Sequence, residues 1–143
     1  MRIGRDCRFH KPRKDSKRAR IFISHRHKDS GQVSFLRNQR KTSCLEFTDY
    51  SIKKPYSLFW KLSARYRIRN SDGVIIALGS STHKSKSVEK EINIAKRYNK
   101  PIIGVPLRKG VAIPKAMVGV GKIIKWNCKN IQKEIDKFRR KRK

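Results

Sequence analysis

Short apolar runs alternate along the chain with longer segments in which apolar residues recur every three or four positions. The runs are bounded by polar or turn-forming residues, a pattern typical of strands that are buried on both faces of a sheet. A further stretch, 44–52 (CLEFTDYSI), alternates apolar and polar residues and predicts a strand near a sheet edge. The four predicted buried strands are 21–23 (IFI), 73–81 (GVIIALGSS), 101–105 (PIIGV) and 122–126 (KIIKW).

Helical periodicity appears between these strands. Residues 113–117 (IPKAM) predict at most a short turn. Alternation of strands and helices implies a parallel sheet with helices on both faces. We therefore predict an α/β fold, a flavodoxin-like three-layer sandwich with a five-stranded parallel sheet in the order 2-1-3-4-5. The predicted helices are 31–43, 57–72, 86–99 and 128–140.

The chain is strongly basic, with 39 Lys and Arg against 10 Asp and Glu among 143 residues and a net charge of +29. The ends contribute only part of this excess, because residues 21–136 hold 24 basic and eight acidic residues, a net charge of +16. The folded domain itself therefore carries a positive field that attracts anionic ligands. We predict a basic flexible arm over 1–19, one domain over 20–136 and a basic tail over 137–143.

Targeting and cysteine signals are few. No apolar run approaches the length of a membrane span, and the first residues lack the apolar core of a secretory signal. The three cysteines are odd in number and form no CxxC pair, which predicts free thiols in a reducing compartment. We therefore expect a cytoplasmic protein without a membrane partner.

A ligand site in such a sheet lies beyond the carboxyl ends of the strands, between the first and third strands. The residues at these ends are small, polar or aromatic, as a nucleotide site requires. Each also has a structural interpretation, as a loop cap or a turn residue. No GxGxxG, GxxxxGK[ST] or GxSxG motif is present, so other nucleotide-binding and hydrolase classes are not indicated. The candidate substrate-binding residues are Ser24, His25, Asp49, Tyr50, Ser80 and Ser81.

Two of the ten acidic residues lie on the helix predicted over 86–99. With Val88 set at zero on a helical wheel, Glu91 falls near about 300°, inside the apolar stripe, and Glu89 near about 100°, on the solvated side. A carboxylate in an apolar stripe is costly unless it is paired or functional. Glu91 is therefore either an ion-pair partner of a nearby Lys or Arg or a site residue, whereas Glu89 is a surface charge.

The chain resembles the TIR-like domain family, in particular bacterial and archaeal domains of the Thoeris ThsB type. The segments that carry the resemblance extend over roughly residues 20–135. They are RIFISHRHKDS, FTDYSI, GVIIALGSSTHKSK, SKSVEKEINIAKRYNKPIIGV and IIKWNCKNIQKEI.

The resemblance implies a flavodoxin-like sheet and, as in the enzymatic members, cleavage of the nicotinamide glycosidic bond of NAD. Some members cyclise the product into a signalling nucleotide. NAD is then a substrate, and no cofactor is implied. The family's catalytic glutamate lies in the pattern Ser-x-Trp-x-x-x-Glu, which corresponds here to Ser85, Ser87 and Glu91. The resemblance thus assigns Glu91 as catalytic and implies a role in anti-phage defence and self-association through the TIR-like domain. From the positive charge of the chain we expect Glu91 to be ionised.

An alternative of a different class remains open. Ser87 stands at the aromatic position of the family pattern, and the +16 charge of residues 21–136 suits a polyanion. The chain would then be a catalytically silent TIR-like module whose basic surface engages nucleic acid or an acidic protein. A metal site is not expected, because His25 and His27 have no acidic or cysteine partner nearby in the sequence.

Overall fold

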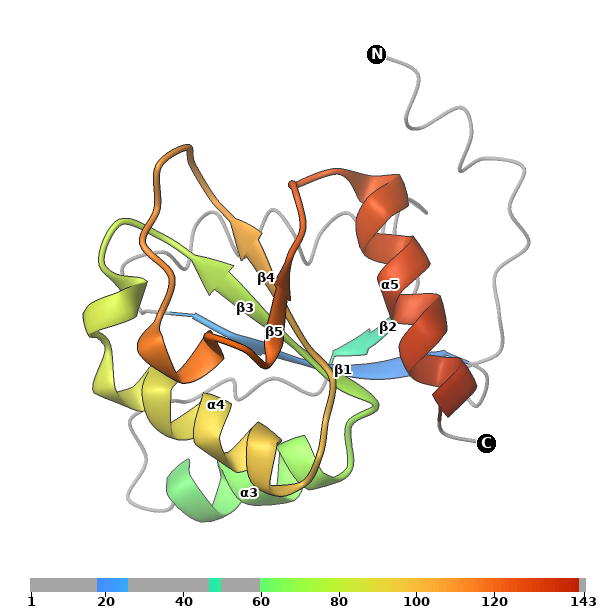
Figure 1. The fold of residues 1–143 in the computed structure, drawn as a ribbon. Coiled ribbons are helices and arrows are strands. Elements are labelled where there is room, and N and C mark those ends of the chain that lie inside the picture. Colours follow the sequence, from blue (N-terminus) through green and yellow to red (C-terminus); the bar gives the residue numbers. More distant parts are fainter. Residues whose placement is uncertain (1–17, 26–46, 50–59, 142–143) are drawn as a thin grey trace.

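A computed structural model describes residues 18–25, 47–49 and 60–141. Among these residues, five strands pair in parallel in the order β2-β1-β3-β4-β5 (Figure 1). The predicted fold class and strand order are therefore confirmed. The strands are β1 (Ala19–Ser24), β2 (Phe47–Asp49), β3 (Gly73–Leu78), β4 (Ile102–Pro106) and β5 (Gly121–Ile123).

Helices cover both faces of this sheet. Figure 1 shows α3 and α4 together on one face and α5 on the other. Two short 3₁₀ turns, η3 after β3 and η4 before β5, complete the described elements. The helix predicted over 31–43 lies outside the described residues. The bounds are α3 (Trp60–Arg69), η3 (Thr82–Lys84), α4 (Lys86–Arg97), η4 (Lys115–Met117) and α5 (Cys128–Lys141).

Side chains alternate across β1 and divide the core in two. Ile21 and Ile23 belong to the cluster packed against α5, whereas Phe22 belongs to the cluster formed with α3 and α4. Because successive side chains of a strand point to opposite faces, Ser24 lies on the same face as Phe22. The last residue of β1 therefore directs its hydroxyl toward the layer that contains α4.

The helix α4 has a defined beginning and end. At its N-terminus, the Ser85 hydroxyl accepts a hydrogen bond from the Val88 amide at 3.3 Å and satisfies one of the free first-turn donors. After its C-terminus, Asn99 adopts a positive φ of 54°, a conformation that asparagine tolerates better than most residues. These two residues mark where α4 begins and ends.

The helix α5 continues to Lys141, beyond the predicted start of the tail at residue 137. Phe138 is buried in the cluster beneath this helix, and its ring lies where a side chain at Gly73 would otherwise project. A Cβ at Gly73 would approach Cε2 of Phe138 to 2.6 Å, so β3 needs glycine at its first position. The boundary placed after residue 136 thus falls inside a packed helix.

Cys128 differs from the prediction for the cysteines. Cys128, the first residue of α5, is disulfide-bonded, so the expectation of free thiols is wrong for this residue. The apolar face of α5 packs on the sheet through Cys128, Ile131, Ile135 and Phe138. Over the described ranges, every helix is too short or too polar to cross a membrane.

Candidate functional site

The carboxyl end of β1 meets α4 through a buried polar contact. The Ser24 hydroxyl donates a hydrogen bond to Oε1 of Glu91 at 3.2 Å, joining residues that are 67 positions apart. Ser24 is 1% exposed and Glu91 is 8% exposed, so water has little access to either group. The sequence-based assignment of Glu91 to the inward face of its helix is confirmed, and Glu89 is exposed as expected.

Burial changes the acidity of Glu91. Desolvation raises the pKa of this carboxyl from 4.5 to about 8, and the hydrogen bond from Ser24 opposes the rise only in part. The expectation that surrounding cations keep Glu91 ionised is therefore wrong, since removal of water outweighs the positive field. At pH 7 the carboxyl is mostly protonated, and it can either donate a proton or lose one when a cation approaches.

The surroundings of Glu91 on its own helix are largely apolar. Val88, Ile92 and Ala95 lie on the same stripe and are fully buried. These neighbours offer no hydrogen-bonding side chain. Among the described residues, the Ser24 hydroxyl is therefore the one side-chain donor that stabilises the ionised form. The hydroxyl at the end of β1 thus makes it easier for Glu91 to lose its proton, although burial remains the larger effect on its pKa.

Ser80 and Ser81 follow β3, the strand next to β1, as predicted. Ser24 pairs with Ile76, and β3 continues to Leu78, so the two serines lie farther along the same sheet edge than Ser24. Ser80 is exposed and Ser81 is half-buried. Both lie in the turn that leads from the carboxyl end of β3 into η3.

Thr82, which the sequence analysis did not single out, organises this turn. Its buried hydroxyl accepts a hydrogen bond from the Gly79 amide at 2.8 Å and donates one to the Ala77 carbonyl at 3.3 Å. A threonine shortly after a buried strand is a signal for such local backbone bonding. Thr82 therefore holds the geometry of the loop that carries Ser80 and Ser81.

The remaining candidates are placed only in part. His25 directly follows β1 and is half-buried. Asp49, the last residue of β2, pairs with Ile21 in the middle of β1, three residues before Ser24, so its backbone does not lie beside Ser24 and His25. Tyr50 and His27 lie outside the described residues. In the portion of the chain with described coordinates, no three His, Cys, Asp or Glu side chains gather in a way that could hold a metal ion.

Ser87 occupies the aromatic position of the family pattern and lies on the outer side of the first turn of α4. It is exposed, and its hydroxyl lies 3.1 Å from that of Ser85 in a hydrogen bond that either group can donate. Ser87 is therefore engaged with the N-terminal cap of the helix. Glu91, one turn later, belongs with Val88, Ile92 and Ala95 to the buried side of α4.

The sequence matches the model of a known family. The family model of the TIR-like domain of Thoeris protein ThsB matches residues 22–110, which include both Ser24 and Glu91. The chain belongs to this TIR-like family. The match covers more than half of the chain and extends from β1 through β4. No curated protein matches the chain.

Two solved structures of low sequence identity are similar to this TIR-like domain. The structure of the Clostridium botulinum CMP N-glycosidase BcmB is 15% identical, with a TM-score of 0.56, and the match covers 82% of this chain and 98% of that one. A 3-dehydroquinate dehydratase-like protein from Bifidobacterium longum is 16% identical, with a TM-score of 0.45 and coverage of 85% and 96%. At such identities the first likeness shows a common fold and the second carries no further weight.

Proposed function

We propose that this TIR-like domain cleaves the N-glycosidic bond of a nucleotide, that NAD is its substrate and that Glu91 is its catalytic carboxylate. The observation that carries the proposal is the buried Glu91 side chain held by Ser24 at the carboxyl end of β1. A buried carboxyl with one hydroxyl partner, at the sheet edge where α/β folds bind ligands, is the arrangement expected of a site residue.

The chemistry of NAD suits a carboxylate in this position. The bond between the ribose carbon and the nicotinamide nitrogen breaks, and its electron pair leaves with nicotinamide, which becomes neutral. Positive charge builds on the ribose, and an anion close to that carbon stabilises it. Water, or a hydroxyl of the same nucleotide if the product is cyclic, then bonds to the ribose carbon and releases a proton.

The raised pKa of Glu91 fits this step. Without a ligand, the group is mostly neutral at pH 7, so folding does not bury an uncompensated charge. The cationic nicotinamide ring of NAD brings an opposite charge, which lowers the pKa of a neighbouring carboxyl. Substrate binding would thereby generate the anion at the place where the transition state needs it, with Ser24 holding one oxygen.

A nucleoside monophosphate is a second candidate, which one observation favours. A pyrimidine or purine base leaves poorly as an anion and is assisted by a general acid, and Glu91 carries a proton at pH 7. The structural neighbour BcmB is described as a CMP N-glycosidase. In this case the neutral form of Glu91 would be the active one, and the rate would fall rather than rise as pH passes about 8.

The test is a base-release assay with the full chain, with and without a crowding agent that promotes assembly. NAD and CMP are supplied separately, and free nicotinamide and cytosine are measured by chromatography at pH values on both sides of the Glu91 pKa of about 8. The proposal expects nicotinamide release that increases with pH. Cytosine release that decreases with pH would mean that the substrate is a nucleoside monophosphate and not NAD. Release of neither base under any condition would refute the proposed activity.

A further inference from the structure

The face of the molecule opposite the Glu91 site carries a regular row of lysines. On α5, the residues Cys128, Ile131, Ile135 and Phe138 are buried against the sheet. On the other side of the helix, lysines recur at intervals of four residues. We call three of them the α5 lysine stripe: Lys129 and Lys133, which are exposed, and Lys137, whose side chain is 43% exposed.

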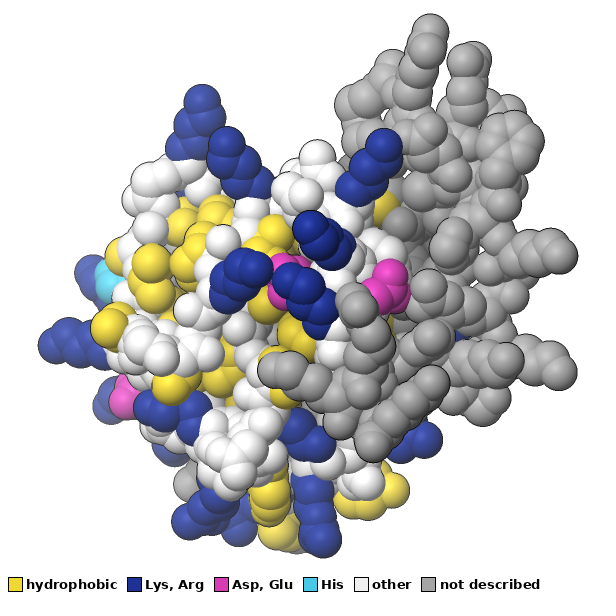
Figure 2. Space-filling view, turned by 45° about the vertical axis from the view of Figure 1, so that its right-hand side comes forward, with side chains coloured by type: hydrophobic (Ala, Val, Ile, Leu, Met, Phe, Trp, Pro, Cys, Tyr) yellow, Lys and Arg dark blue, Asp and Glu magenta, His cyan; other side chains and the backbone are white. Residues whose placement is uncertain are grey.

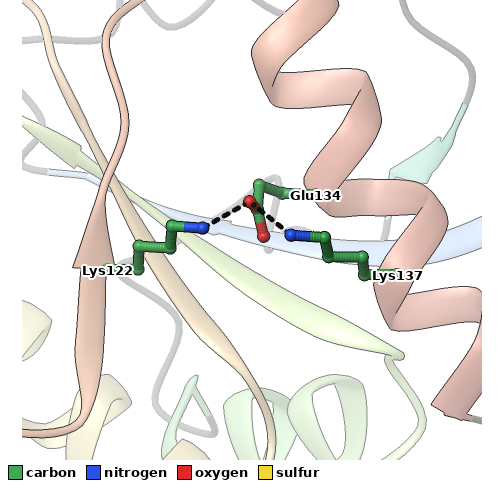
Figure 3. Close-up of polar contacts among 3 residues, drawn as sticks. All are labelled: Lys122, Glu134 and Lys137. Carbon is green, nitrogen blue, oxygen red and sulfur yellow. Dashed lines mark hydrogen bonds and ion pairs between the residues drawn. The ribbon is translucent and has the colours of Figure 1, made fainter.

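The acidic residues of α5 do not cancel this stripe. Oε1 of Glu134 accepts from Nζ of Lys122 at 2.8 Å and from Nζ of Lys137 at 3.2 Å, and Figure 3 shows these two ammonium groups reaching it from β5 and from α5. Burial raises the pKa of Glu134, but the two lysines outweigh burial and hold this pKa below its usual value of 4.5. Asp136 accepts from Nε2 of Gln132 at 3.0 Å. Because α5 holds more Lys and Arg than Asp and Glu, a surplus of positive charge remains.

This surplus extends over the surrounding surface. Figure 2 shows many Lys and Arg side chains and few acidic ones on the face that carries β5 and α5. Lys125, in the connection between these elements, is also exposed. The positive charge is therefore a property of the folded domain at this face and does not depend on the chain ends.

We propose that the α5 lysine stripe, with Lys122, binds the sugar-phosphate backbone of nucleic acid without reading its sequence. Lysines four residues apart on a helix are separated by about 6 Å, so Lys129 and Lys137 span about 12 Å. Duplex DNA presents one negative charge for every ~1.7 Å of its axis, so the stripe faces several phosphates at once. Each ammonium is a point charge suited to phosphate, whereas base recognition favours the bidentate fork of arginine.

The side chains beside the stripe favour nucleic acid over an anionic membrane. A helix that lies on a bilayer inserts large apolar side chains beside its lysines. The large exposed hydrophobic residues of the described chain lie on α3 and in the segment from Ile113 to Ile123, and α5 has none. The exposed side chains described on α5 are the polar or cationic Lys129, Asn130 and Lys133, which suits a solvated polyanion. This inference does not depend on the proposed catalytic function, because it concerns the opposite face of the sheet.

The experiment compares two double variants of the full chain that lose the same charge. Lys129→Gln with Lys133→Gln removes two exposed stripe residues and leaves the pairs to Glu134 intact. Lys90→Gln with Lys96→Gln removes two exposed lysines from α4, on the other face. Binding of a short fluorescent duplex DNA is measured by anisotropy between about 50 and about 200 mM salt.

The stripe variant is expected to bind at least about tenfold more weakly, with a logarithmic salt slope smaller by about two, because each phosphate contact contributes about 0.9 to that slope. The α4 variant and the charge-preserving Lys129→Arg/Lys133→Arg variant should bind as the parent does. Equal losses in the two glutamine variants, or no duplex binding by the parent, would overturn the proposal. So would stripe-dependent binding to vesicles of anionic lipid or to polyglutamate with unchanged binding to DNA.

Discussion

The hydroxyl of Ser24 and the carboxyl of Glu91 meet across 3.2 Å in the interior, between the end of β1 and the middle of α4. Burial raises the pKa of Glu91 to about 8, and this one hydrogen bond limits the rise. The two residues therefore act as a unit in which Glu91 is the reacting group and Ser24 is a positioning residue. The predictions below follow from this relationship and from the packing that supports it.

Replacing Ser24 by alanine should make Glu91 a weaker acid. A hydrogen bond to a charged group contributes about 1.5 kcal/mol, so its loss should raise the pKa by about one unit. If ionised Glu91 drives NAD cleavage, the rise of kcat/KM with pH should shift to higher pH by about one unit. Ser71→Ala is the control, because the Ser71 hydroxyl is also buried but donates to the Ile68 carbonyl at 2.7 Å. If kcat/KM of the Ser24 variant rises at the same pH as that of the parent, the role assigned to Ser24 is contradicted.

The Glu91 carboxyl should lower stability as pH rises. Its pKa is about 8 in the folded state and close to 4.5 in the unfolded chain, so the folded state holds more protons between these values. Stability therefore falls as pH increases from 4.5 through 8, by on the order of 3 kcal/mol at pH 7. Glu91→Gln should remove this dependence and be more stable than the parent at pH 8. Urea unfolding at several pH values measures this effect, and Glu89→Gln, at an exposed position, should behave as the parent.

Binding of NAD should release a proton near pH 7. The oxidised nicotinamide ring is cationic and favours ionised Glu91, whereas the ring of NADH is neutral and does not. Because Glu91 is mostly protonated at pH 7, we expect release of close to one proton for each NAD bound. Calorimetry in buffers of different ionisation enthalpy measures this number. Proton release that is equal for NAD and NADH, or that persists in Glu91→Gln, would show that another group is responsible.

Gly73 and Phe138 should be energetically coupled. Phe138→Ala removes a buried ring and is expected to cost about 3 kcal/mol or more. Gly73→Ala places a methyl group 2.6 Å from Cε2 of the same ring and should cost about 1–3 kcal/mol. In the double variant the methyl group occupies vacated space, so the combined loss in unfolding free energy should be smaller than the sum of the two. Additive losses would mean that the ring and the glycine do not constrain each other.

The sequence predicted the sheet and the inward face of α4 because both depend on local periodicity. Buried runs and helical spacing identified β3 and separated Glu91 from Glu89, and the burial of each residue agrees. The protonation of Glu91 was not predicted correctly, because the net charge of a sequence says nothing about how much water the fold removes from one carboxyl. Nor did the pattern show that Phe138 anchors the last turns of α5, since the basic residues around it resemble a tail.

Thr82 and Ser24 also differ in how far their contacts could be predicted from the sequence. Ser24 was a candidate from its place at the end of a predicted strand, but its partner on α4 depends on a crossover that no local pattern specifies. Thr82 forms its bonds within five residues and could have been recognised from the strand-turn pattern. Hydrogen bonds between neighbouring residues can therefore be predicted from the sequence, whereas contacts between distant segments can be identified only once the sheet is known.

The most direct test of the account compares two glutamates on one helix. Purified parent, Glu91→Ala and Glu89→Ala proteins are incubated with NAD, with and without a crowding agent, and nicotinamide release is followed. The account predicts release by the parent and by Glu89→Ala, and loss of at least about a hundredfold in Glu91→Ala, as expected for a residue that stabilises the transition state. Release by both variants at the parent rate, or no release by the parent in any assembled form, would contradict it.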